Sequence, residues 1–282
     1  MILETTIKKA SKILKNHNID SHELDAEVIL SNIMGVNREF LITNNHTYVA
    51  KNIITKYNFA INRRINGEPV AYIIGKKEFW SENFKVNSGT LVPRPETELL
   101  IYKVVSLFNN KKINILDIGT GSGCILLSIL KELNFSRGIG IDISTEAIKV
   151  AKANSKLMNL TCRSKFKVFD LNSLIIGKFD LIVSNPPYIP NKDMKKLSRD
   201  ILNYEPHIAL KGGIDGLDLI KKVVYKSNNL LKKNGILAIE IGNGQYKKVS
   251  FILKKSGFRE ISKVYDYNSN VRCIMSTKNG FF

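Results

Sequence analysis

Cysteine is scarce in this sequence, with three residues in a chain of 282. Cys124, Cys162 and Cys273 lack the close spacing of a metal site and cannot all pair as disulfides, so we expect a reducing environment. Long apolar runs are missing too, since none approaches the ~20 residues that cross a bilayer. Residues 1–15 lack the apolar centre of a signal peptide. We therefore expect a cytoplasmic protein with no membrane partner.

Acidic residues are also few, 25 against 43 lysines and arginines, which gives a net charge of +18. Such an excess favours a polyanionic partner such as nucleic acid. Arginine, however, supplies only nine of the 43 basic residues, and lysine lacks the planar guanidinium that makes two-point contacts to phosphates and bases. A general bias towards lysine explains the charge as well. The charge is compatible with a basic surface that contacts RNA, but we do not expect the protein to require nucleic acid for its function.

The first part of the chain, residues 1–75, has the apolar spacing of three and four that is typical of amphipathic helices. The predicted helices span residues 2–15, 22–34, 38–42 and 49–65. Ser21 is the expected cap of the second helix, and Gly35 is its expected end. Short helices without a strand indicate a small bundle. The pattern leaves open whether this bundle recognises a substrate or serves as a scaffold.

The pattern then changes to one that favours extended chain. The segments expected to be extended are residues 70–75, 77–80 and 84–87. The last two would form a β-hairpin linker, residues 76–93, with its turn at residues 81–83. Pro93 and Pro95 stiffen the chain that follows, and a helix is expected at residues 98–108.

Strands and helices alternate through the remaining domain, residues 94–282, which predicts an α/β fold with a mostly parallel sheet. The expected strands are residues 113–118, 138–143, 166–170, 179–184 and 235–241. The expected helices between and after them are residues 124–133, 144–157, 216–231 and 245–256. Residues 261–265 and 272–275 are expected to pair as a final antiparallel hairpin.

A glycine-rich loop follows the first of these strands, with Gly119, Thr120, Gly121, Ser122 and Gly123 in sequence. Its Gly-x-Gly-x-Gly pattern is tighter than the dinucleotide fingerprint, and no Lys-Ser/Thr follows, so a nucleoside triphosphate is not indicated. Asp142 ends the next strand, at the position where a carboxylate usually holds ribose hydroxyls. The alternative for Asp142 is a helix cap, a role that Ser144 can also fill. The pattern predicts a nucleoside cofactor without a pyrophosphate.

The strand at residues 179–184 ends in Asn185, Pro186, Pro187 and Tyr188. The prolines stop the strand and make the loop stiff, and ligands bind at the carboxyl ends of such strands. The side-chain oxygen of Asn185 and the carbonyl of Pro186 can accept the two hydrogens of a planar amino group, while Tyr188 packs on its plane. No His, Lys or Cys occurs in this loop to act as a base. The alternative is a simple proline turn.

Together, Asp117-Ile118 with the glycine loop and the Asn-Pro-Pro-Tyr loop resemble the class I S-adenosylmethionine-dependent methyltransferases that modify exocyclic or amide nitrogens. Residues 63–75, 93–98 and 204–210 are similar to the release factor glutamine methyltransferase family, over nearly the whole chain and in the family's order. That family methylates N5 of the glutamine in the Gly-Gly-Gln motif of class 1 peptide chain release factors. The resemblance implies a Rossmann-like domain with a mostly parallel seven-stranded sheet, preceded by a helical bundle.

The resemblance also implies roles for single residues. S-adenosylmethionine, which leaves as S-adenosylhomocysteine, would be bound by Gly119, Thr120, Gly121, Ser122, Gly123, Asp142, Asp170, Leu171 and Asn185. The substrate would be bound by Asn185, Pro186, Pro187, Tyr188, Arg94 and Glu205, of which Asn185, Pro186 and Tyr188 are the catalytic residues. Some relatives have tryptophan in place of Leu171, so apolar contact with adenine is expected there. We expect a monomer and no metal ion.

Two other functions fit part of the pattern. An adenine-N6 methyltransferase of DNA or RNA would use the same loop, but the sequence offers no target-recognition domain or aromatic-rich basic arm. A cofactor-binding module without catalysis would not need Asn185 and Tyr188.

Overall fold

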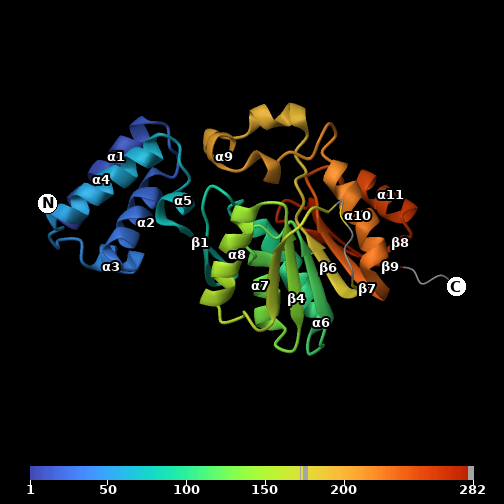
Figure 1. The fold of residues 1–282 in the computed structure, drawn as a ribbon. Helices are drawn as coiled ribbons and strands as arrows, with labels where there is room; N and C mark the ends of the chain where they lie inside the picture. Colours follow the sequence, from blue (N-terminus) through green and yellow to red (C-terminus); the bar gives the residue numbers. More distant parts are fainter. Residues whose placement is uncertain (172, 174–176, 279–282) are drawn as a thin grey trace. The chain divides into compact units, whose positions relative to one another are not determined.

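The computed structural model describes residues 1–171, 173 and 177–278. The chain divides into two compact units (Figure 1). The first contains Met1–Lys76 together with Ser198–Tyr204, and the second contains Lys77–Leu197 together with Glu205–Phe282.

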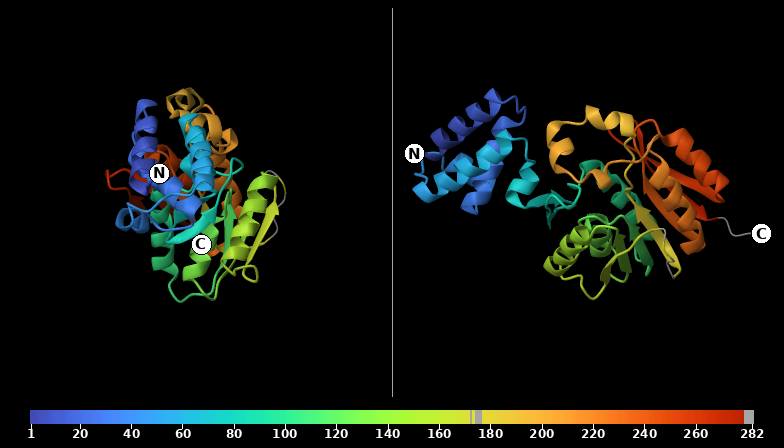
Figure 2. Two further views of the ribbon diagram at one scale, coloured as in Figure 1. Left: turned by 90° about the vertical axis from the view of Figure 1, so that its left-hand side faces the viewer. Right: turned by 45° about the horizontal axis from the view of Figure 1, so that its top comes forward.

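The first unit is helical, as expected, and its short helices pack side by side in the blue to cyan part of the chain (Figure 2). Its helices are α1 (Leu3–Asn16), α2 (His22–Met34), α3 (Arg38–Thr43), α4 (Lys51–Ile65), α5 (Val70–Ile74) and, far along the chain, α9 (Arg199–Tyr204). Tyr57 is buried in the core of this bundle, and its hydroxyl donates to the carbonyl of Ala26 at 2.9 Å. The Tyr204 hydroxyl donates to the carbonyl of Asn66 at 3.0 Å, which ties α9 to the bundle.

Two local predictions for this unit were wrong. The side chain of Ser21 makes no capping hydrogen bond to α2, although Gly35 ends that helix in the left-handed region as expected. Residues 70–75 are not extended, because Val70–Ile74 is the helix α5. The carbonyl of Pro69 accepts from the amides of Tyr72 and Ile73, so the proline begins a helical turn here. A short apolar run does not distinguish a buried strand from a buried helical turn, and tertiary packing decides.

The second unit begins with the expected hairpin of β1 (Lys76–Phe79) and β2 (Glu82–Lys85). Its turn consists of Trp80 and Ser81, which both have positive φ, 52° and 57°. A two-residue turn of this kind matches the twist of the paired strands. The turn therefore comes one residue earlier than expected, and Glu82 lies in the strand.

The main sheet of the second unit has seven strands in the order β5-β4-β3-β6-β7-β9-β8. The strands are β3 (Asn114–Ile118), β4 (Arg137–Asp142), β5 (Ser164–Val168), β6 (Phe179–Ser184), β7 (Leu231–Glu240), β8 (Phe258–Tyr265) and β9 (Val271–Lys278). The first five strands in this order are parallel, and β9 is antiparallel to both β7 and β8. The mostly parallel seven-stranded sheet and the final hairpin are confirmed.

Helices cover both faces of this sheet (Figure 1). The helices are α6 (Glu98–Phe108), α7 (Cys124–Glu132) and α8 (Thr145–Leu157) on one face, and α10 (Asp218–Leu230) and α11 (Tyr246–Lys255) on the other. Three short 3₁₀ segments complete the unit: η1 (Pro95–Thr97), η2 (Asn191–Lys196) and η3 (His207–Ala209).

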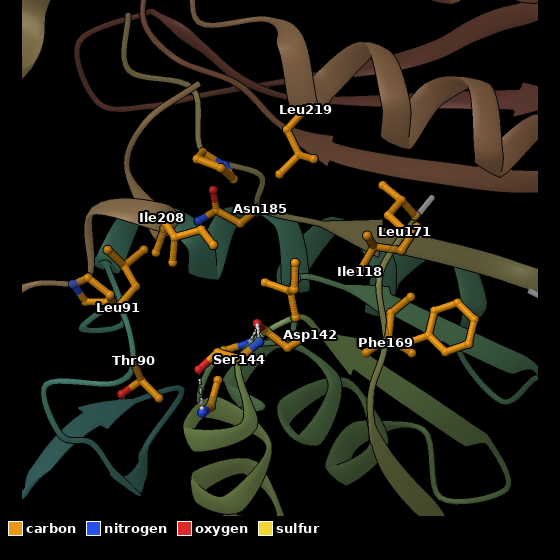
Figure 3. Close-up of a pocket in the computed structure, with 18 of the residues that line it drawn as sticks. Thr90, Leu91, Ile118, Asp142, Ser144, Phe169, Leu171, Asn185, Ile208 and Leu219 are labelled. Carbon is orange, nitrogen blue, oxygen red and sulfur yellow. Dashed lines mark hydrogen bonds between the residues drawn. The ribbon is translucent and has the colours of Figure 1, made fainter. Parts of the chain in front are cut away.

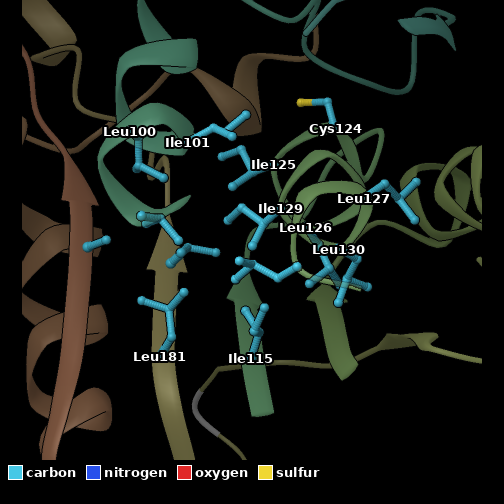
Figure 4. Close-up of a cluster of buried hydrophobic side chains, with 14 of the residues drawn as sticks. Leu100, Ile101, Ile115, Cys124, Ile125, Leu126, Leu127, Ile129, Leu130 and Leu181 are labelled. Atoms are coloured by element: carbon cyan, nitrogen blue, oxygen red, sulfur yellow. The ribbon is translucent and has the colours of Figure 1, made fainter. Parts of the chain in front are cut away.

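The core follows from the alternation of side chains along each strand. Leu181 and Val183 of β6 pack with Ile115 against α6 and α7 (Figure 4), while Ile182 between them packs on the opposite face. Each of these side chains is at most 1% exposed, and burial of one such aliphatic side chain stabilises a fold by about 1.5–3 kcal/mol. The continuous apolar runs of the sequence therefore reflect strands that are covered on both faces.

Among the described residues, no helix has the length and apolar character needed to cross a membrane. The carboxyl ends of β3, β4, β6 and β7 meet at one edge of the sheet, because these strands are parallel and adjacent. That edge carries the glycine loop after β3, Asp142 at the end of β4 and the proline loop after β6.

Candidate active site

The glycine loop turns directly from β3 into α7. Gly119, Gly121 and Gly123 have φ values of 71°, 55° and 81°, in the left-handed region that favours glycine. A side chain at Gly119 or Gly121 would meet no atom within 4 Å, so these two glycines border open space. At Gly123 an added carbon would lie 3.2 Å from atoms of Leu127 and Ala151. Gly119 and Gly121 thus leave room for a ligand, while Gly123 allows helix and sheet to pack closely.

The polar side chains of this loop point into the protein. The Thr120 hydroxyl donates to Oδ2 of Asp117 at 2.6 Å, and both side chains are buried. Burial raises the pKa of Asp117 to about 7, against the lowering effect of the Thr120 hydrogen bond. Ser122 is buried as well, and its carbonyl accepts from Nδ2 of Asn154 at 2.9 Å. The side chains of Thr120 and Ser122, two residues predicted to bind the cofactor, are thus turned away from solvent, and the Thr120 hydroxyl supports the loop from within.

Asp142 is held by two backbone amides. Its Oδ2 accepts from the amide of Gly121 and its Oδ1 from the amide of Ser144, each at 2.9 Å (Figure 3). The cap of α8 is Ser144, whose hydroxyl accepts from the amide of Ala147 at 3.1 Å. A helix cap therefore does not account for Asp142. Each carboxylate oxygen retains a lone pair for a further donor.

A cavity of about 250 Å³ opens beside these groups (Figure 3). The predicted site residues that line it are Gly119, Gly121, Asp142, Asp170, Leu171, Asn185 and Pro187. Its other walls come from the segment after β2 (Gly89, Thr90, Leu91), from the chain around η3 (Pro206, Ile208, Ala209) and from α10 (Leu219, Lys222). The predicted residues Thr120, Ser122, Gly123, Pro186, Tyr188, Arg94 and Glu205 are not part of its lining.

The proline loop begins where β6 ends. Ser184, the last residue of β6, donates to the carbonyl of Ile118 at 2.8 Å and so links this loop to the end of β3. Pro186 is buried. The carbonyl of Tyr188 accepts from Nε2 of Gln245 at 2.9 Å. Burial raises the pKa of the Tyr188 hydroxyl to about 12, so this hydroxyl is neutral at physiological pH. The loop is fixed by bonds at both ends.

The amide of Asn185 is supported from behind by two residues whose role the sequence did not reveal. Its Nδ2 donates to Oγ1 of Thr97 at 3.2 Å, and the Thr97 hydroxyl donates to Oε2 of Glu240 at 2.7 Å. Thr97 is 2% exposed and Glu240 3%. Burial raises the pKa of Glu240 to about 7. The available signal was a single glutamate within the apolar run of residues 235–241.

Arg94 and Glu205 interact with each other. Nη2 of Arg94 donates to Oε1 of Glu205 at 2.6 Å, and the amide of Val92 donates to Oε2 at 3.2 Å. The Glu205 side chain is 1% exposed and that of Arg94 31%. A buried carboxylate needs such partners, so the pair joins the start of the domain to the chain before η3.

The arrangement as a whole is that of a class I methyltransferase, and the comparisons with known proteins agree. A methyltransferase domain family matches residues 109–278, and the PrmC N-terminal domain family matches residues 5–75. The catalytic domain of hMettl16, solved in complex with MAT2A 3′UTR hairpin 6, shares the fold. It has a TM-score of 0.59 and 16% sequence identity, and the similarity covers 82% of this chain and 83% of that chain.

Two relatives define the family more closely. The release factor glutamine methyltransferase of Clostridium acetobutylicum is 38% identical, over 99% of this chain and 100% of that protein. The release factor glutamine methyltransferase of Buchnera aphidicola subsp. Schizaphis graminum is 40% identical, over 96% of this chain and 98% of that protein. The chain belongs to the release factor glutamine methyltransferase family.

Proposed function

We propose that this protein transfers a methyl group from S-adenosylmethionine to the side-chain amide nitrogen of the glutamine in the Gly-Gly-Gln motif of a class 1 peptide chain release factor. Such a modification would support translation termination. The observation that carries the proposal is that Asp142 and Asn185 line the same cavity in a chain of this family. One residue suits a ribose and the other suits an amide.

The residues of the cavity fit S-adenosylmethionine. Gly119 and Gly121 leave open space beside the backbone, which lets a ligand come close to the loop. The Asp142 carboxylate, aimed by two amides, has the free lone pairs that a ribose diol requires. Leu171 gives an apolar surface for a base, with Asp170 beside it. When bound, the cofactor would supply a methyl group activated by a positive sulfonium.

The protein's contribution to catalysis would be alignment and charge stabilisation. An amide nitrogen is a poor nucleophile, because its lone pair is delocalised into the carbonyl. Oδ1 of Asn185 and the carbonyl of Pro186 would accept its two hydrogens, and so aim the nitrogen and stabilise the positive charge that develops on it. In-line alignment contributes up to roughly 7–11 kcal/mol. The nitrogen would gain the methyl group that the cofactor supplies, and one amide proton would pass to water, since no His, Lys or Cys of the loop acts as a base.

Arg94 and Glu205 are proposed to act indirectly. Since their charged groups bind each other, the pair would hold the cavity wall at Pro206 in place and need not touch the glutamine. The other sequence-based expectations remain part of the proposal. We propose action in the cytoplasm, a monomeric enzyme, no metal ion, a helical first unit that recognises the release factor, and no requirement for nucleic acid.

The test offers the protein S-adenosylmethionine with a labelled methyl group. Separate reactions contain an intact class 1 release factor, its Gln→Ala variant in the Gly-Gly-Gln motif, DNA and RNA. Label on the intact factor alone is the expected result. Label on nucleic acid would indicate an adenine-N6 methyltransferase instead, and label on none of the four would indicate a cofactor-binding module without catalysis.

A further inference from the structure

Three distant segments of the chain meet behind Asn185. Thr97 lies at the junction of η1 and α6, Glu240 ends β7, and Asn185 follows β6. Since β7 pairs with β6, with Ile239 beside Ser184, the glutamate lies next to the start of the proline loop. The hydrogen bonds run in one direction, from Nδ2 of Asn185 to Thr97 and from the Thr97 hydroxyl to Glu240.

The direction follows from the number of hydrogens available. An ionised carboxylate only accepts, and a hydroxyl has one hydrogen to donate. When Thr97 gives its hydrogen to Glu240, its oxygen can only accept from Asn185. The group of Asn185 that faces Thr97 must then be the NH₂ and not the oxygen. Asn185 also lowers the pKa of the Glu240 carboxylate, as an NH₂ group on that side of the amide would.

We propose that Thr97 and Glu240 are positioning residues that select one of the two flipped orientations of the Asn185 carboxamide. With Nδ2 committed to this pair, Oδ1 is the atom that remains to accept a hydrogen from the substrate. In the opposite orientation, Asn185 would present its NH₂ to the substrate's NH₂, and two donors would face each other. The inference rests on the proposed function, because it assigns Oδ1 of Asn185 to the glutamine amide.

The charge of Glu240 should then matter for the reaction. Its pKa is raised to about 7, first by burial and then by Glu96, and is lowered by Thr97, Arg272 and Asn185. Once protonated, Glu240 can donate to Thr97, whose hydrogen becomes available to Oδ1 of Asn185. The orientation is then no longer enforced. Other titratable groups near the carboxylate are Cys124, Cys273 and Tyr188.

The neighbours Cys124, Cys273 and Tyr188 do not offer an equivalent transition near pH 7, whereas Asp117 beneath the glycine loop does, with its pKa also raised to about 7. Burial raises the pKa of the Cys124 thiol to about 12 and that of Cys273 well above its usual value, so both stay neutral. The Tyr188 hydroxyl also stays neutral, with its pKa raised to about 12. Activity should therefore fall as the pH is lowered through about 7, and the part of that fall that Glu240 causes should be absent from a Glu240 variant but present in Asp117→Asn.

The first test compares three variants in methyl transfer to the release factor. Thr97→Val removes the hydroxyl, and kcat should fall on the order of 10-fold, with the Kd for S-adenosylmethionine within about 2-fold of wild type. Thr97→Ser keeps the hydroxyl and should restore kcat. Ser128→Ala removes another fully buried hydroxyl, on α7, and should leave kcat unchanged. A merely structural role is indicated if Thr97→Ser is as slow as Thr97→Val, and unchanged kcat in Thr97→Val overturns the proposal.

The second test measures the acidic limb of the pH–kcat profile. Glu240→Gln cannot ionise and can both donate and accept, so it should lower kcat and weaken the limb near pH 7, whereas Asp117→Asn should keep the part of the limb that Glu240 causes. If Glu240→Gln keeps the whole wild-type limb, Glu240 does not set the orientation. Failure of the wild type to label the release factor would count against the proposed function and not against the orientation.

The third test is independent of activity. The ¹⁵N side-chain amide signal of Asn185, identified by its loss in Asn185→Ala, should shift with pH around 7 in the wild type. In Glu240→Gln the signal should not shift with pH. In Thr97→Val the chemical shifts of the two amide hydrogens should move closer together, and both hydrogens should exchange faster with water. A signal that titrates equally in wild type and Glu240→Gln would overturn the inference, whatever the substrate.

Discussion

Replacement of the buried Asp117 by Asn should change how the stability of the protein depends on pH. Asp117 lies beneath the glycine loop, is 0% exposed, and accepts from the Thr120 hydroxyl at Oδ2, while no described residue donates a hydrogen bond to its Oδ1. Its pKa rises from the usual 3.8 to about 7 in the folded protein. Between these values the folded protein holds a proton that the unfolded chain has lost. The free energy of unfolding therefore falls as the pH rises through this window. Below the window Asp117 is protonated in both states and does not lower it.

The size of the effect follows from the shift. A full shift from 3.8 to about 7 corresponds to about 4 kcal/mol at 1.36 kcal/mol per unit. Roughly two of these units lie between pH 5 and pH 7, so about 3 kcal/mol is lost between pH 5 and pH 8. Asparagine has nearly the same shape and no charge to bury. The stability of Asp117→Asn relative to wild type should thus improve by about 3 kcal/mol from pH 5 to pH 8. Glu240 is present in both proteins and cancels in this difference.

Urea unfolding without cofactor, at pH 5 and pH 8, measures this difference. Trp80 is the only tryptophan of the chain and lies in the second unit, so its fluorescence reports on the unit that contains Asp117. Asp193→Asn is the matched control. That carboxylate is partly exposed and its pKa is lowered by Lys196, so it is ionised in both states across the range. The reasoning is refuted if the difference between Asp117→Asn and wild type is the same at both pH values, or grows in the opposite direction.

Three further predictions follow from single contacts. Asn185→Ala should abolish labelled methyl transfer and leave the calorimetric Kd for S-adenosylmethionine near normal, because this amide faces the substrate; retained activity would contradict its role. Asp142→Ala should weaken cofactor binding by about 10-fold to 100-fold, as expected for the loss of charge-assisted hydrogen bonds, and an unchanged Kd would count against a ribose contact. Tyr57→Phe should lower the free energy of unfolding of the helical unit by about 1–2 kcal/mol, since the carbonyl of Ala26 loses its donor; thermal melts that match wild type would rule this out.

The sheet was predictable because its strands are covered on both faces. A strand such as β6 has no solvent side, so Leu181, Ile182 and Val183 appear in the sequence as one apolar run. The Asn-Pro-Pro-Tyr loop ends that run because proline cannot continue the ladder. The place of Asp142 beside the glycine loop was also predictable, since it ends the strand after that loop, where a carboxylate usually holds ribose hydroxyls.

The errors and omissions have a different origin. Residues 70–74 are apolar and partly β-branched, which favours a strand, yet the packing of Ala71 and Tyr72 in the bundle makes them helical. The bond from Thr97 to Glu240 joins residues 143 positions apart. Only the order of the strands brings them together, and no local pattern records it. Arg94 and Glu205, 111 positions apart, are a second case.

The proline loop by itself does not distinguish glutamine from adenine. Both substrates present a planar NH₂ group. The two proposed acceptors, Oδ1 of Asn185 and the carbonyl of Pro186, would contact only the two hydrogens of that group. Selection between a narrow side chain and a wide base has to come from the surroundings of the loop. Two of the stretches that resemble the glutamine methyltransferases lie there. Residues 93–98 supply Thr97 behind Asn185, and residues 204–210 supply the cavity wall at Pro206, Ile208 and Ala209. The stretches that carry the family resemblance therefore also form the surroundings of the proline loop. Substitutions in that cavity wall should alter the choice of substrate more than substitutions in the glycine loop.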